Sequence, residues 1–137
     1  MYSGDKMKVF EKYIFLFLFG GLGYGMIEIA FRGFTHWSMV ITGGTAILSL
    51  YLIHKVFPNM TIIIKSLIGC GIITSLEFTV GLIVNRIYNF SVWDYTNMPI
   101  NLLGQISLSF SLCWFALSMI IFVFFYCAEK IINYKKS

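Results

Sequence analysis

Four long apolar runs, with charged residues gathered near their ends, constrain this chain more than any other feature of its sequence. The runs cover approximately residues 13–31, 37–57, 62–84 and 102–127. Each is long enough for a helix to cross a hydrocarbon core of ~30 Å at a rise of ~1.5 Å per residue. Helices are expected because a lone strand would leave its backbone amides unpaired in lipid. We therefore expect an all-α, polytopic membrane protein whose single four-helix domain covers residues 1–137.

The charge content agrees with this class. Of the 137 residues, 58% are hydrophobic and 12% are charged, whereas about a quarter of a soluble domain is charged. The first apolar run is long and no small-x-small cleavage site follows it, so we expect a retained span and not a signal peptide.

The basic residues orient the predicted bundle. The eight lysines lie at or near one set of run ends: Lys6, Lys8, Lys12, Lys55, Lys65, Lys130, Lys135 and Lys136. The two arginines, Arg32 and Arg86, lie at the opposite set. The positive-inside rule makes the lysine-rich side cytoplasmic, so both termini are expected there. Lysines that flank apolar spans suit anionic lipid headgroups, so the basic pI does not indicate a nucleic-acid partner.

The segment between the third and fourth runs is rich in aromatic and amide side chains. It reads NRIYNFSVWDYTNMPIN over residues 85–101 and is expected to form an extracytoplasmic loop. Tyr88, Trp93 and Tyr95 suit a belt at the headgroup level. The loop either lies on the membrane surface or dips between the helices.

Three amide side chains mark the entry to the fourth run. Asn97, Asn101 and Gln105 follow one another at spacings of four. We expect them to cap the fourth helix, and hydrogen bonding to a ligand is the alternative.

Five charged residues are expected to form one polar cluster. Glu28 and Glu77 each lie fifteen residues beyond the start of an outward-running helix, about 22 Å from its inner edge. Arg32 lies one turn beyond Glu28 on the same face. Arg86 ends the third run, and Asp94 lies in the loop above it.

Two interpretations of this cluster stay open. A charge that faces lipid costs several kcal/mol, so these groups should face the interior and pair. The cluster is then either a binding or permeation site for a polar or ionic ligand, or an ion-pair network that locks the helices together.

Small and polar residues predict the packing faces of the helices. The first run holds Gly21 and Gly25 as a GxxxG pair, and the third holds Cys70 and Thr74 on one stripe. Such residues let helices approach closely in a membrane. Packing is therefore the expected role of these stripes.

Several kinds of chemistry are disfavoured by the sequence. Its three cysteines do not form a CxxC pair, and no Walker A sequence occurs, so we expect no metal site and no nucleotide hydrolysis within this chain. His36 and His54 lie at run ends on opposite sides of the membrane, where interfacial positions are expected. Paired carboxylates could carry out acid/base chemistry, but no nucleophile–base pair is visible. We expect no enzyme activity and no cofactor.

Three stretches of the chain resemble a known family. They are RGFTHWSMVITGG (32–44), LEFTVGLIVN (76–85) and WDYTNMPINLLGQISLSFSLCWF (93–115). They are similar to the small bacterial membrane proteins named ABC-transporter type IV, or CmpB-like. The resemblance covers most of the chain from Gly21 to about Phe122. It implies a permease-like protein in the bacterial inner membrane, with a separate ATPase subunit as a partner.

The family pattern also marks individual positions. These are Glu28, Arg32, Gly33, Gly43, Gly44, Glu77, Asn85, Trp93, Asp94, Tyr95, Pro99, Asn101 and Gly104. Four of them, Glu28, Arg32, Glu77 and Asp94, belong to the charged cluster that helix depth predicts, and this coincidence favours a functional role.

The leading hypothesis is a transport-related membrane component with an outward-facing polar site. In it, Glu28 and Glu77 bind a cation, a proton or an amine, and the two arginines tune or clamp these carboxylates. Because four spans enclose little cavity, we expect a homo-oligomer or a partner membrane protein. The alternative is a non-transporting interaction or assembly protein whose cluster is structural and whose aromatic loop docks a partner.

Overall fold

A computed structural model of the chain describes residues 3–33 and 35–136, apart from the side chains of residues 3, 31 and 32. Four helices among these residues are long and apolar enough to cross a membrane. They are α1 (Ser3–Arg32), α2 (Trp37–Val56), α3 (Ile62–Gly81) with its π-helical continuation η1 (Leu82–Ile87), and α4 (Leu108–Lys136). The predicted all-α, four-span fold is confirmed.

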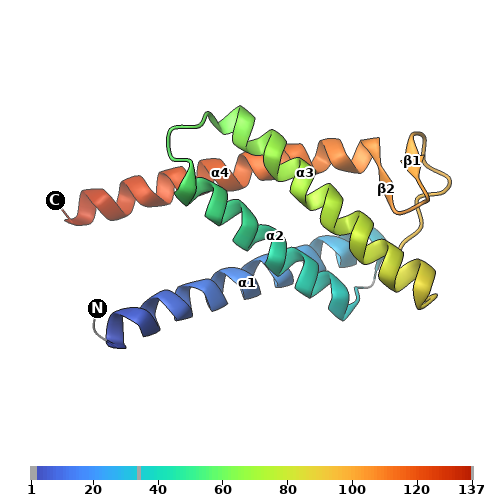
Figure 1. Cartoon of the computed structure of the whole chain (residues 1–137), viewed down its shortest axis with the longest axis horizontal. Coiled ribbons are helices and arrows are strands. Elements are labelled where there is room, and N and C mark those ends of the chain that lie inside the picture. The colour runs from blue at the N-terminus through green and yellow to red at the C-terminus, as the bar shows by residue number, and fades with distance from the viewer. Residues whose placement is uncertain (1–2, 34, 137) are drawn as a thin grey trace.

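The helices form two hairpins that share one bundle (Figure 1). α1 packs against α2, α3 packs against α4, and α2 also contacts α3. The start of α1, the end of α4 and the α2–α3 loop lie at one end of the bundle. The α1–α2 turn and the segment between η1 and α4 lie at the opposite end.

The outer surface of the bundle is apolar. Large side chains such as Phe15, Met26, Leu112 and Ile120 are 62–70% exposed. A soluble monomer rarely presents so much contiguous apolar surface to water. This surface is suited to contact with lipid tails, as expected for a multi-pass membrane protein.

Local capping fixes the ends of α1 and α2. Gly33 follows α1 with a φ of +81°, and its N–H donates to the carbonyl O of Ile29 at 2.8 Å. Glycine tolerates this left-handed conformation, which commonly ends helices. His36 caps α2, because its Nδ1 accepts from the N–H of Ser38 at 3.2 Å. α2 ends at Val56, shortly before Pro58, as the restriction on residues preceding proline predicts.

α4 begins later than the apolar pattern indicates. Strands β1 (Asn101–Leu102) and β2 (Ile106–Ser107) form an antiparallel hairpin in place of the first helical turns expected from residue 102. The left-handed Gly104, with a φ of +70°, lets the chain reverse between them. Ser107 Oγ then accepts from the N–H of Phe110 at 3.3 Å and caps α4.

The small residues pack the helices as predicted. A Cβ on Gly21 would lie 2.5 Å from the carbonyl O of Val40 in α2. Between α3 and α4, Cys70 Sγ donates to the carbonyl O of Ser111 at 3.0 Å, and Thr74 Oγ1 lies 3.1 Å from Ser111 Oγ. These contacts bring the backbones of each hairpin close together.

Candidate functional site

Glu77 lies at the centre of a hydrogen-bonding network that joins three segments. Its side chain is 1% exposed. Oε1 accepts from the hydroxyls of Tyr24 (3.1 Å) and Tyr95 (3.2 Å), and Oε2 accepts from the indole N–H of Trp114 (3.0 Å). A buried carboxylate is costly unless hydrogen bonds stabilise it, and these donors come from α1, the α3–α4 segment and α4.

Ring contacts hold the donors in place. Tyr24 stacks on Trp114 with a centroid distance of 5.3 Å. Tyr95 stacks on Phe110 at 4.7 Å, and Phe110 lies 6.4 Å from Trp114. Because aromatic pairs in these geometries are favourable beyond their burial, the donors are positioned by packing as well as by Glu77.

The segment between η1 and α4 enters the bundle instead of lying over it. Trp93 and Tyr95 are each 4% exposed, whereas Tyr88 is 62% exposed. The predicted headgroup belt is therefore wrong for Trp93 and Tyr95. Gly81 makes room for this segment, since a Cβ there would lie 2.6 Å from Gln105 Oε1 and 2.8 Å from the ring of Trp93.

Asn85, in the π-helical turn, ties this segment to the hairpin. Its Oδ1 accepts from the N–H of Val92 at 2.7 Å, and its Nδ2 donates to Gln105 Oε1 at 2.9 Å. The indole N–H of Trp93 donates to the carbonyl O of Gln105 at 2.8 Å. Single π-helical turns often occur at functional sites, and this one adjoins the last residue of α3.

Glu28 lies on the wall of a cavity beside this network. Its side chain is 5% exposed. The cavity holds about 280 Å³ and is lined by Ile27, Glu28, Met98, Ser109, Phe110, Cys113 and Trp114. Trp114 therefore contacts both this cavity and Glu77. The two predicted acids lie at the same end of the bundle, around Tyr24 and Trp114.

The other three members of the predicted cluster do not join this site in the described structure. Arg86 is exposed, and its Nη1 donates to the carbonyl O of Leu103 at 3.4 Å. Asp94 is also exposed, and the N–H of Thr96 donates to its Oδ1 at 2.9 Å. Long arginine side chains reach polar surroundings at helix ends, where their charge is more easily solvated. The side chain of Arg32 is among those not described. Of the five predicted residues, the described structure brings together Glu28 and Glu77.

A backbone hydrogen bond perturbs Asp94. The N–H of Thr96, assisted by the Thr96 side chain, lowers the pKa of Asp94 below its usual value. Asp94 therefore stabilises a local turn in the loop and does not line the cavity.

The amide residues before α4 stabilise the loop and do not cap the helix. Asn97 is exposed. Asn101 Nδ2 donates to the carbonyl O of Met98 at 2.9 Å, and its Oδ1 accepts from the N–H of Gly104 at 3.1 Å. The expected capping role is wrong for Asn101 and Gln105, because the hairpin displaces the start of α4 and Ser107 takes the capping position.

A second polar cluster, at the opposite end of the bundle, was missed by the sequence analysis. Lys65 and His54 are 3% and 6% exposed, so both side chains are buried within the bundle. Lys65 Nζ lies 3.4 Å from His54 Nδ1, and His54 Nε2 lies 3.0 Å from Glu129 Oε2. Lys65, Gly69, Ile73 and Glu77 recur at intervals of four on the buried face of α3. This spacing could have revealed the burial of Lys65.

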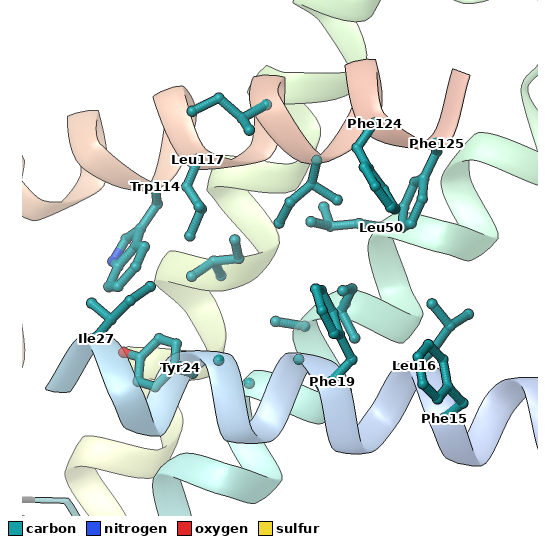
Figure 2. Close-up of a pocket in the computed structure, with 18 residues that line it drawn as sticks. Phe15, Leu16, Phe19, Tyr24, Ile27, Leu50, Trp114, Leu117, Phe124 and Phe125 are labelled. Atoms are coloured by element: carbon teal, nitrogen blue, oxygen red, sulfur yellow. The ribbon is translucent and has the colours of Figure 1, made fainter. Parts of the chain in front are cut away.

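A larger, apolar cavity of about 450 Å³ lies between α1 and α4. Figure 2 shows side chains of α1, such as Phe19 and Tyr24, opposite side chains of α4, such as Leu117 and Phe124. The Tyr24 hydroxyl and the Trp114 indole nitrogen lie at the same end of this cavity (Figure 2).

Four apolar helices built around a buried, hydrogen-bonded carboxylate define a small polytopic membrane protein. The chain belongs to the family described as "Putative ABC-transporter type IV", whose sequence model matches residues 25–136. It is therefore a membrane protein related to transporters, and the family resemblance in its sequence is confirmed. No curated protein and no solved structure matches the chain.

Proposed function

We propose that this protein is the membrane component of a transport system, in which Glu28 and Glu77 form an extracytoplasmic site for a cation. A protonated amine suits the site best. The orientation rests on the lysine distribution, which favours cytoplasmic termini in a bacterial inner membrane. Glu28 and Glu77 then lie in the outer half of the bundle.

The placement of Glu28 carries this proposal. Glu28 lines a cavity of about 280 Å³ together with the aromatic residues Phe110 and Trp114. Aromatic faces beside a carboxylate are the groups that recognise ammonium ions, because the ring quadrupole attracts the cation. The volume is close to the lower end of the ~300–1,000 Å³ range of ligand pockets, which fits a small ammonium group.

Glu77 contributes by holding the wall of the same cavity in place. Its carboxylate accepts from Tyr24, Tyr95 and Trp114, and Trp114 also lines the cavity at Glu28. Hydrogen bonds to a carboxylate are stronger than those between neutral groups. Glu77 thus fixes the position of Trp114 beside the proposed cation site.

The α2–α3 connection bears on possible partners. Only residues 57–61 join α2 to α3, which leaves little surface there for coupling to an ATPase. A second copy or another membrane protein is therefore the more suitable partner for completing a permeation path.

The alternative is a non-transporting interaction protein. Its expected docking surface included Trp93 and Tyr95, both of which are buried. A partner would have to use exposed residues such as Tyr88 and Phe90, which stack on each other at 5.6 Å. The burial of the other two aromatic residues favours the transport proposal.

Binding and uptake of ethylammonium test the proposal. Protein in phosphatidylglycerol nanodiscs is titrated calorimetrically, and uptake of the labelled ion is followed in liposomes. Glu28→Gln preserves shape and removes the charge, and should weaken binding by about tenfold or more. The matched control is Glu11→Gln, an exposed position on the same helix.

The possible outcomes separate the hypotheses. Equal binding by the native protein and Glu28→Gln would overturn the site. Binding without uptake would leave the site intact and refute transport by this chain alone, in favour of the interaction protein.

A further inference from the structure

The two cavities are adjacent and differ in chemistry. The apolar cavity between α1 and α4 and the acidic cavity at Glu28 share Ile27 and Trp114 as wall residues. Because the two cavities meet at these residues, together they offer a combined space with a long apolar part and Glu28 in the wall at one end. This is the shape and polarity of an amphiphile with a cationic headgroup.

We propose that this combined space binds a long-chain amine, with its ammonium group at Glu28 and its alkyl chain in the groove between α1 and α4. The inference rests on the proposed function and specifies the class of its ligand. An alkyl chain supplies the apolar surface that matches the groove. The carboxylate and the Trp114 ring select an ammonium group over an anionic headgroup.

The length of the groove supports a chain of lipid-like size. On α1 it extends from Phe15 to Ile27, which is about 18 Å at the helical rise. One leaflet occupies about half of a ~30 Å hydrocarbon core. The groove is therefore long enough for a chain that reaches across one leaflet.

The depth of the acidic end agrees with this placement. Glu28 lies four residues before the last residue of α1, Arg32, which is about 6 Å along the axis. The headgroup would therefore lie close to the membrane surface, and the chain would run inward along α1. The lipid-facing sides of both helices would let such a molecule enter from the bilayer.

Gly23 keeps the groove open. It lies on the groove wall, and a Cβ added there would meet nothing within 4 Å. A larger side chain at this position would occupy the groove without a clash in the helix packing. Gly71 on α3 is equally open and lines neither cavity, so it offers a matched control.

The experiment compares the affinities of ethylammonium and dodecylammonium for the protein in phosphatidylglycerol nanodiscs, with empty discs subtracted. The native protein should bind the long amine at least about tenfold more tightly, because each buried methylene adds affinity. Gly23→Leu should lower the affinity for dodecylammonium about tenfold relative to that for ethylammonium. Gly71→Leu should behave as the native protein does.

If Gly23→Leu leaves the preference for the longer amine intact, this inference is overturned. Binding of ethylammonium would in that case still support the proposed function. If Glu28→Gln changes the binding of neither amine, this inference and the proposed function are both overturned. Discs that contain phosphatidylethanolamine provide a further test. If that lipid abolishes dodecylammonium binding, the groove is occupied by an aminophospholipid and the long-chain amine is the wrong ligand.

Discussion

The indole N–H of Trp114 donates to Oε2 of Glu77 over 3.0 Å, and this bond joins α4 to α3 deep in the bundle. Trp114 also stacks on Tyr24 of α1. A single side chain thus connects the buried acid, the first helix and the walls of both cavities. The stability of this arrangement can be tested separately from ligand binding.

Trp114→Phe should lower the free energy of unfolding by about 1–3 kcal/mol, because it removes a donor from a buried carboxylate. Reversible unfolding in mixed detergent micelles measures the change. Trp37→Phe is the control, since Trp37 is 63% exposed and should change stability little. Combining Trp114→Phe with Glu77→Gln should be non-additive. Strict additivity would show that the bond contributes nothing to stability.

Gly43→Ala should destabilise the α1–α2 hairpin by about 1–3 kcal/mol, the usual cost of overpacking. Its Cβ would lie 2.5 Å from the carbonyl O of Gly20 and 2.5 Å from Cβ of Tyr24. Gly71→Ala should be neutral or stabilising by up to ~1 kcal/mol, because its site is open and alanine favours helix. The same unfolding assay compares the two. A similar effect of both variants would argue against the close approach of α1 and α2.

The pKa of Asp94 should be lowered by the hydrogen bonds of the turn in which it lies. Its pKa is lowered first by the backbone N–H of Thr96 and second by the Thr96 side chain. Since the folded pKa is below the unfolded one, the ionised form stabilises the loop above the unfolded pKa of about 3.9. That contribution is lost as pH falls through the folded pKa.

Carboxyl NMR shifts of Asp94 check this prediction. Thr96→Val removes the hydroxyl and keeps the backbone N–H, so the pKa should rise only part of the way to its usual value. A complete return would mean that the backbone hydrogen bond has no effect on the carboxylate.

The Lys55–Glu129 ion pair should contribute little to the free energy of unfolding. Its atoms lie 2.6 Å apart, but the side chains are 47% and 40% exposed. Solvent screening limits such pairs to about 1 kcal/mol or less. Lys55→Gln should therefore reduce stability slightly, and added salt should diminish the difference. A larger loss that is independent of salt would mean that the pair is effectively buried.

The sequence predicts the membrane-spanning architecture well because each span has a strong local signal. Apolar runs bounded by charge identify all four helices, and the small residues identify the faces on which they pack. The burial of Glu28 and Glu77 follows from the cost of a charge facing lipid. These features depend on residue type and helical period alone.

The loop and its contacts could not be predicted in this way. Trp93 and Tyr95 have an amphipathic character that suits either the headgroup region or a buried hydrogen bond, and only tertiary contacts with Gly81 and Glu77 decide between them. The hairpin before α4 depends on the positive φ of Gly104, which apolar periodicity does not register. Arg86 could reach either an acid or the surface, and its side-chain length permits both.

The position of Glu77 has a mechanical consequence for the bundle. One carboxylate terminates hydrogen bonds from α1, from the segment that re-enters the bundle and from α4. Displacing this one side chain would loosen three anchors in a single event, so the segments at this end of the molecule are held as one body. The opposite end divides its polar contacts among Lys55, His54, Lys65 and Glu129, so its polar contacts form a chain and do not converge on one carboxylate.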